Sequence, residues 1–424
     1  MAETMKNTGI EWIGKIPEEW EIKRFKYLHN GTNVGESIDK EYWSQDKSDF
    51  VFYTAGETNI YNTYTKFPSW KYVKQQDLLL ARNGTPYVYL PPINAQYSDH
   101  IIRTKIKNDY DKRFIRYCLK LSIENEKVEV VSLATWSVSI WNEQEIPLPS
   151  ISEQTKIADF LDKQTSKIDA IIKTNEEQLE VLKKYKKSLI TQTVTKGMNK
   201  NAKMKDSGID WIGQIPEGWE MQRMKYILVK ENPIRVGPFG TALTTSDYTD
   251  DGKWVYNQRV VLDKNFLEND TFISEQKARE LKGFKVYPND ILITTRGTIG
   301  KVAKVPVNCP EGVLHPCIIR FRVDEKKLPY SLIDFLFNQS DFILEQITRY
   351  SNATTIDVIY SETLKNLIVP IIPQTELKEI IDFLSEKCTK IDSLITQKQQ
   401  AIDTMQKYKK SLIYEYVTGK KRIK

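Results

Sequence analysis

The chain of 424 residues has few of the side chains on which catalytic and metal sites depend. It contains three histidines and four cysteines, and the cysteines show no CxxC spacing, so neither a zinc site nor a disulfide framework is expected. No apolar run approaches the roughly 18 residues that cross a membrane, and the first residues lack the apolar core of a signal peptide. We therefore expect a cytoplasmic protein with no membrane contact and no bound metal.

Two motifs of nucleotide and base chemistry are also missing. The GxxxxGK[ST] loop that holds ATP phosphates does not occur. An Asn/Asp-Pro-Pro-aromatic loop, with which an adenine methyltransferase holds a flipped base, has only a poor counterpart in Asn232-Pro233-Ile234. An enzymatic function therefore has no support in the sequence, and we expect no cofactor in this chain.

The composition is that of a folded globular protein. Hydrophobic residues make up 40% of the chain and charged residues 28%, and the net charge is +6. The length predicts two to three domains. Because acidic residues nearly balance the basic ones, any contact with nucleic acid must depend on local clusters of residues.

The chain contains an internal duplication made of two separate blocks. Residues 9–20 (GIEWIGKIPEEW) match residues 208–219 (GIDWIGQIPEGW) at nine of 12 positions, and residues 157–195 match residues 380–418 at 17 of 39 positions. A duplication of this size indicates two copies of one architectural unit. The sequences between the blocks differ almost completely, and a repeated frame with two unlike inserts suits a protein that recognises two different things.

The second repeated block predicts two long helices, at 152–196 and 375–418. Neither contains proline or glycine; Pro149 and Pro373 precede them, and Gly197 and Gly419 follow. Residues spaced by four and three positions form a heptad seam through which the helices would pack on each other, although each helix could instead pack only on its own domain. The predicted seam is Ile157, Leu161, Gln164, Ile168, Ile171, Asn175, Gln178, Leu182, Tyr185 and Leu189, repeated as Ile380, Leu384, Lys387, Ile391, Leu394, Lys398, Ala401, Met405, Tyr408 and Leu412.

The inserts, at about 21–150 and 220–372, have the composition of compact α+β domains. Short runs rich in Val, Ile, Thr and Tyr are broken by Gly, Pro, Asn and Asp, which indicates strands joined by tight turns, and residues 331–347 have a helical pattern. The predicted organisation is one domain at 1–150, a helix at 151–197, a second domain at 198–372, and a second helix with a basic tail at 373–424.

In both inserts a strand that begins with an acid runs into a basic turn, as DLLLARNGT at 77–85 and DILITTRGT at 290–298. Together with the repeated GI[ED]WIGxIPExW segment and the repeated IADFLD…KID…YKKSLI helices, these turns resemble those of the specificity (S) subunits of type I restriction-modification enzymes. The resemblance covers essentially the whole chain. One departure is that the first turn lacks the glycine-containing continuation GTIGKV of the second.

The resemblance implies two α+β target recognition domains, each reading one half of a bipartite site in double-stranded DNA, joined by two long helices packed as an antiparallel coiled coil. It also implies docking of two methyltransferase (M) subunits that bind S-adenosylmethionine, and recruitment of ATP-driven restriction (R) subunits. This chain would then be a non-catalytic subunit in antiviral defence. A coiled-coil scaffold without DNA readout and a DNA-modifying enzyme are the alternatives from other classes.

Candidate DNA contacts are side chains on turns that can form two hydrogen bonds with a base edge, as Arg does with guanine and Asn or Gln with adenine. Glycine-rich turns with exposed amides and the basic stretch 103–120 are candidates for phosphate contact. Each of these residues could instead be an ordinary solvated turn residue. The predicted DNA-binding residues are Arg82, Asn83, Thr85, Thr58 and Asn59 in the first domain and Arg296, Thr294, Thr295, Asn257, Gln258, Arg259, Gly240 and Thr241 in the second.

The sequence YKKSLI occurs in both helices, at 185–190 and 408–413. Its lysines could simply complement the dipole near a helix C-terminus. Because these six residues stay identical while the flanking sequence drifts, we expect that two equal partner molecules contact them. The predicted partner-binding residues are Tyr185, Lys186, Lys187, Tyr408, Lys409 and Lys410.

Overall fold

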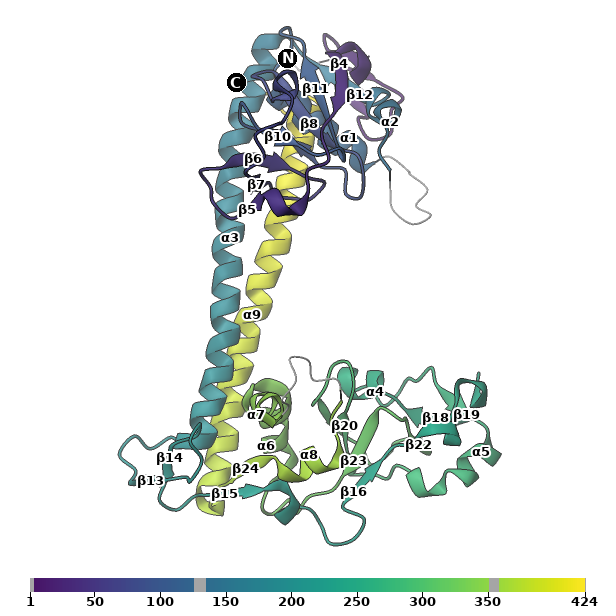
Figure 1. The fold of residues 1–424 in the computed structure, drawn as a ribbon, viewed down its shortest axis with the longest axis vertical. Coiled ribbons are helices and arrows are strands. Elements are labelled where there is room, and N and C mark those ends of the chain that lie inside the picture. The colour runs from purple at the N-terminus through teal and green to yellow at the C-terminus, as the bar shows by residue number, and fades with distance from the viewer. Residues whose placement is uncertain (1–3, 126–134, 351–357, 424) are drawn as a thin grey trace. The chain divides into compact units, whose positions relative to one another are not determined.

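The structure is a computed structural model that describes residues 4–125, 135–350 and 358–423 (Figure 1). The chain divides into two compact units, one made of residues 1–175 with 400–424 and the other of residues 176–399. Each unit contains one globular domain, called here the first and the second domain, and a part of both long helices. Among the described residues, no helix has the length and apolar character needed to cross a membrane.

The two long helices are α3 (Ile151–Lys196) and α9 (Gln374–Val417). At the start of α3, the Ser150 hydroxyl accepts a hydrogen bond of 3.3 Å from the Glu153 amide, which is a helix N-cap. Both helices end at a glycine in the left-handed conformation, Gly197 with φ 71° and Gly419 with φ 68°. A glycine in this position ends many helices because it has no Cβ to strain the turn.

The helices run antiparallel, and matching ion pairs join them in the two units. In the second unit, Lys186 of α3 lies 2.7 Å from the Asp392 carboxylate of α9. In the first unit, Lys409 of α9 lies 2.6 Å from the Asp169 carboxylate of α3. The two pairs consist of the same residues of the duplicated block, exchanged between the helices, as a pseudo-twofold relation requires. The antiparallel helix pair that the resemblance implied is confirmed.

The spacing of the seam differs from the predicted heptads. Ile171 and Tyr185 are 46% and 55% exposed, and their counterparts Leu394 and Tyr408 are 45% and 54% exposed. The observed seam has ten positions in each helix, and the nine steps between them span 33 residues, or about 3.67 residues per turn. This is the period of an 11-residue repeat. It lies closer to the 3.6 residues per turn of a straight helix than the 3.5 of a heptad does. The heptad register was therefore wrong. The buried or half-buried seam is Ile157, Leu161, Thr165, Ile168, Ile172, Asn175, Leu179, Leu182, Lys186 and Ile190 in α3 and Ile380, Leu384, Cys388, Ile391, Ile395, Lys398, Ile402, Met405, Lys409 and Ile413 in α9.

The first domain has a main sheet of four strands and a smaller sheet of four. The main sheet has the order β4-β11-β8-β9, and β11 is antiparallel to both neighbours. The smaller sheet has the order β10-β6-β7-β5, in which β10 and β6 run parallel. Helix α1 shares one apolar core with the main sheet and α3. The bounds are β4 (His29–Val34), β5 (Trp43–Ser44), β6 (Phe50–Tyr53), β7 (Ile60–Asn62), β8 (Asp77–Ala81), β9 (Val88–Tyr89), β10 (Gln96–Tyr97), β11 (Ile101–Ile106), α1 (Lys112–Glu124) and α2 (Val138–Asn142).

The second domain repeats this arrangement although its sequence is unrelated. Its main sheet has the order β16-β23-β20-β21 and its smaller sheet the order β17-β19-β18-β22, with β18 and β22 parallel. The α+β class of both domains is confirmed. The bounds are β16 (Ile234–Val236), β17 (Tyr248–Thr249), β18 (Lys253–Tyr256), α4 (Gln258–Asp263), β19 (Phe272–Ile273), α5 (Glu275–Glu280), β20 (Ile291–Thr294), β21 (Val302–Lys304), β22 (Gly312–Leu314), β23 (Ile318–Phe321) and α8 (Ser361–Asn366).

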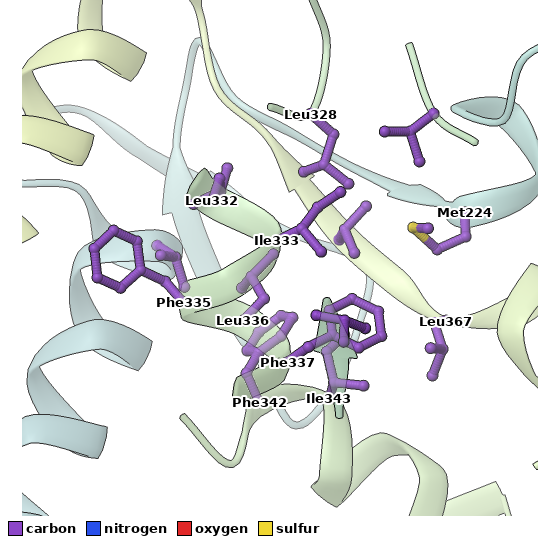
Figure 2. Packing of buried hydrophobic residues seen from close by; sticks show 14 of the residues in the cluster. Met224, Leu328, Leu332, Ile333, Phe335, Leu336, Phe337, Phe342, Ile343 and Leu367 are labelled. Carbon is purple, nitrogen blue, oxygen red and sulfur yellow. The ribbon is translucent and has the colours of Figure 1, made fainter. Parts of the chain in front are cut away.

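The helical segment predicted at 331–347 is interrupted. It consists of α6 (Tyr330–Asp334), a π-helical turn at Phe335–Gln339 and α7 (Phe342–Tyr350). The Asn338 amide bonds with both backbone groups of Val302 in β21, at 3.0 and 2.9 Å, which ties the turn to the sheet. The apolar residues of this segment, among them Phe335, Phe337 and Phe342, pack together in the core of the second unit (Figure 2).

The end of each long helix packs against one copy of the first repeated block. This block consists of a hairpin, a buried tryptophan and a short strand. A Cβ on Gly197 would lie 3.4 Å from the Trp219 ring, and one on Gly419 would lie 3.2 Å from the Trp20 ring. The two repeated blocks thus contact each other in both units. The strands are β1 (Met5–Asn7), β2 (Lys15–Pro17) and β3 (Glu21–Arg24), which pairs with β12 (Glu145–Leu148), and β13 (Met204–Asp206), β14 (Gln214–Pro216) and β15 (Glu220–Arg223), which pairs with β24 (Ile368–Ile371).

Candidate nucleic-acid interface

Most of the predicted DNA-binding residues of the first domain lie at one edge of its main sheet. We call this the reading edge: it is where β4 and β8 end and the antiparallel β11 begins between them. Arg82, Asn83 and Thr85 follow β8 directly. The Arg82 amide donates to the carbonyl oxygen of His100, the residue before β11, at 2.9 Å. Arg82 and Thr85 are exposed and Asn83 is half-buried.

Thr58 and Asn59 lie in the loop that follows β6. The Tyr89 hydroxyl holds this loop, because it donates to the carbonyl oxygens of Thr54 and Gly56 at 3.2 and 2.6 Å. Burial raises the pKa of Tyr89, so the phenol keeps the proton that it donates. Thr58 is exposed and Asn59 half-buried.

The second domain has the same reading edge, where β16 and β20 end and β23 begins. The Thr295 amide donates to the Cys317 carbonyl oxygen at 3.0 Å, as Arg82 does to His100. Thr295 therefore stands at the position of Arg82, and the exposed Arg296 stands at the position of Asn83. The two domains present different side chains at equivalent places of the same frame.

The side chains of Thr294 and Thr295 are buried, at 0% and 3% exposure. The Thr294 hydroxyl donates to the Thr298 carbonyl oxygen at 2.6 Å and accepts from the Lys301 amide at 3.0 Å. The Thr294 side chain thus holds the turn that carries Arg296, and in this conformation neither threonine side chain is accessible from the surface.

Asn257, Gln258 and Arg259 lie at the start of α4, after β18, which is the equivalent of β6. Asn257 caps α4 by accepting from the Val260 amide at 3.1 Å. Arg259 is exposed and forms an ion pair of 2.9 Å with Asp270. Gln258 donates to the Thr298 carbonyl oxygen at 3.4 Å, which places its side chain against the turn of Arg296.

Gly240 and Thr241 are exposed in the loop that follows β16 at the second reading edge. The loop turns at Gly237, where a Cβ would lie 2.1 Å from the His315 carbonyl oxygen, so only glycine fits. Burial lowers the pKa of His315. Its neutral ring accepts a hydrogen bond of 3.0 Å from the Cys317 amide through Nδ1 and fixes the chain before β23.

Two features of the reading edges escaped the sequence reasoning. His100 lies with its Nδ1 2.9 Å from the Asn83 side-chain nitrogen, and only the strand pairing brings these residues together. Phe239, 58% exposed, precedes Gly240. The basic stretch 103–120, in contrast, bonds largely within the chain: Arg103 donates to three carbonyl oxygens and Arg113 contacts three carboxylates.

The lysines of the repeated YKKSLI sequence have partners inside the chain. Lys186 and Lys409 form the two ion pairs between the long helices. Lys187 lies 2.9 Å from Asp341 of the second domain, and Lys410 lies 2.8 Å from Glu124 of the first. Intramolecular pairing therefore accounts for the identity of the lysines in both copies, whereas Tyr185 and Tyr408 point to solvent.

The family model of the type I restriction modification DNA specificity domain matches residues 17–181 and 233–404. The chain belongs to this family. It is thus a DNA specificity subunit with two recognition domains, and each match contains one domain and most of the long helix that follows it.

Individual relatives agree with this assignment. The type I restriction enzyme MjaVIII specificity subunit of Methanocaldococcus jannaschii is 26% identical, over 97% of this chain and 95% of the relative. The EcoBI specificity subunit of Escherichia coli is 23% identical over 86% of this chain and 77% of the relative. A solved chain of a type I restriction-modification system shares the fold, with a TM-score of 0.66, 14% identity and coverage of 95% of this chain and 98% of that one.

Proposed function

We propose that each reading edge recognises one half of a bipartite site in double-stranded DNA. The observation that carries this proposal is the pair of equivalent sheet edges with unlike accessible side chains, Arg82 and Asn83 in one domain and Arg296, at the position of Asn83, in the other. A scaffold without DNA readout has no need for such a difference. Arg82 and Arg296 are suited to guanine and Asn83 to adenine, because these pairs form two hydrogen bonds each.

The chain acts in this proposal as a non-catalytic subunit that docks two methyltransferase subunits on its long helices. Residues that directly precede a seam position are exposed and apolar at equivalent places of both units: Tyr185 and Leu394 in the second unit, Ile171 and Tyr408 in the first. Tyrosine is a typical anchor of protein interfaces, and apolar side chains that gather on a surface are typical of interaction sites. Their duplication supports two equal partners.

The test is methylome sequencing of cells that carry the intact gene, a deletion, Arg82→Ala or Arg296→Ala. We expect methylation of a two-part motif that disappears on deletion. Arg82→Ala should relax the preference in one half of the motif and Arg296→Ala in the other. If both variants change the same half, or reduce methylation at all sites without changing the motif, the assignment of one reading edge to each half is wrong.

A further inference from the structure

The side chains of Asn83 and His100 meet at the reading edge of the first domain. Asn83 Nδ2 lies 2.9 Å from His100 Nδ1. Both backbones are fixed: Asn83 forms an isolated bridge with Thr135, and the His100 carbonyl accepts from the Arg82 amide. The His100 amide also donates to the Ser98 hydroxyl at 3.3 Å. The contact thus joins two anchored residues, one after the end of β8 and one before the start of β11.

The chemistry of this contact sets the direction of the Asn83 amide. An amide nitrogen can only donate, so His100 Nδ1 accepts, and the imidazole carries its single proton on Nε2. One N–H of Asn83 is used in this bond. The Oδ1 atom and the second N–H remain, and these are the acceptor and donor that pair with N6 and N7 of adenine in the major groove.

We propose that His100 is a positioning residue, which orients the Asn83 amide to read an adenine in the half-site of the first domain. This rests on the proposed DNA-reading function. Without an acceptor at position 100 the amide can turn over, because its two ends are similar in size. A turned amide presents N–H groups to the N6 donors of adenine, and the preference for adenine falls.

The second domain offers a control for the inference. Arg296 stands at the place of Asn83 and Cys317 at the place of His100. The backbone of Cys317 occupies the same position as that of His100. Its neighbour Arg296 needs no orienting residue, because every side-chain nitrogen of an arginine is a donor. Replacement of Cys317 should therefore leave both halves of the motif unchanged.

The experiment uses the full chain co-purified with its methyltransferase subunits and duplexes that carry the methylated motif or single-base changes in it. Competition binding is measured for wild type, Asn83→Ala, His100→Ala, the double variant, His100→Gln and Cys317→Ala. We expect Asn83→Ala and His100→Ala to reduce the preference for adenine at the same position, by up to about 5- to 150-fold, the factor of one bidentate pair. The double variant should show no further loss.

The His100→Gln variant distinguishes a positioning role of the His100 side chain from a role in packing. A glutamine can offer its side-chain oxygen as the acceptor, so we expect this variant to keep much of the adenine preference that His100→Ala loses. His100→Lys, which can only donate, should lose the preference at least as far as His100→Ala does. Thermal melting of each variant verifies that the first domain is folded.

Three results would overturn the inference. If Asn83→Ala relaxes an adenine position and His100→Ala does not, His100 has no positioning role, while the reading-edge proposal stands. If His100→Ala weakens binding to all duplexes alike, His100 contacts the DNA backbone instead. If neither variant changes any base preference, Asn83 does not read a base, and the Arg82 and Arg296 variants then decide whether the reading edges bind DNA at all.

Discussion

At the scale of single residues, Thr294 and Arg296 have opposite roles although only one residue separates them. Thr294 is buried and bonded to the turn, and Arg296 is exposed on it. The sequence predicted DNA-binding residues in this turn but could not show which side chains are buried and which are exposed. The separation depends on where β20 ends and on the left-handed Gly297, φ 62°, which turns the chain outward.

We predict that Thr294→Val lowers the free energy of unfolding by about 1 to 3 kcal/mol, because it removes both hydrogen bonds of the buried Thr294 hydroxyl, to the Thr298 carbonyl and from the Lys301 amide. Thr298→Val, at an exposed position of the same turn, should change it by less than about 0.5 kcal/mol. Urea unfolding of the purified chain measures both. Equal effects would show that the Thr294 hydroxyl does not hold the turn.

A second residue-scale prediction concerns the acid that begins the equivalent strands. Asp290 is fully buried, 2.5 Å from Arg322 and 3.4 Å from Arg320, which is itself buried. Asp290→Ala leaves a buried guanidinium without its carboxylate and should cost about 3 to 5 kcal/mol.

Asp77→Ala in the first domain is the matched control and should cost less. Its partner Arg103 lies 3.6 Å away and retains three carbonyl acceptors. Burial also raises the pKa of Asp77. The folded protein therefore stabilises the ionised carboxylate less well than water does, and losing this carboxylate should cost less. Thermal melting compares the variants, and a larger loss for Asp77→Ala would contradict this explanation.

At the scale of elements, the sequence predicted the long helices well because proline, glycine and capping residues mark their ends. It placed the seam wrongly at Ile171, Tyr185 and their counterparts because a four-three alternation fits five heptads only if the helices supercoil. Over this length the natural period of the helix brings Ile172 and Lys186 to the seam instead. Lysine was hard to foresee there, since its charge is paired with Asp392 of the other helix, which the sequence of one helix does not show.

The exposed tyrosines give the element-scale prediction. Tyr185→Asp should remove one of two docking sites and leave a complex with a single methyltransferase subunit, and Tyr408→Asp should do the same at the other site. Native mass spectrometry of the co-expressed complex reports the stoichiometry. Tyr226→Asp, at an exposed tyrosine of the second domain, is the control. A full complex with all three variants would show that this face does not dock the partner.

At the scale of the whole molecule, the repeated frame could be inferred from the sequence, but the likeness of the two domains was visible mainly in the strand and turn at 77–85 and 290–298. Their strands share almost no residues, yet the sheet order is the same. The equivalence rests on backbone bonds, such as those of Gly35 with Ile101 and Gly237 with Ile318, which few side-chain identities reveal. The strand pairing also confirms that Arg296 is the counterpart of Asn83, as the alignment of residues 77–85 with residues 290–298 indicates.

The whole-molecule prediction is that the purified chain alone transfers no methyl group to DNA. The sequence has no loop for a flipped base and no phosphate-binding loop. Incubation with labelled S-adenosylmethionine and DNA that contains the motif should give no incorporation until methyltransferase subunits are added. Incorporation by the chain alone, after removal of contaminating enzymes, would contradict the prediction.

The exchanged ion pairs of the long helices bear on the ancestry of the molecule. In a symmetric homodimer, residue i of one copy contacts residue j of the other and the reverse contact is made as well. Lys186 with Asp392 and Lys409 with Asp169 obey this rule inside a single chain. Fusion of two identical protomers would leave such a frame: each half would carry both sides of the interface, and the inserted domains could diverge without disturbing it.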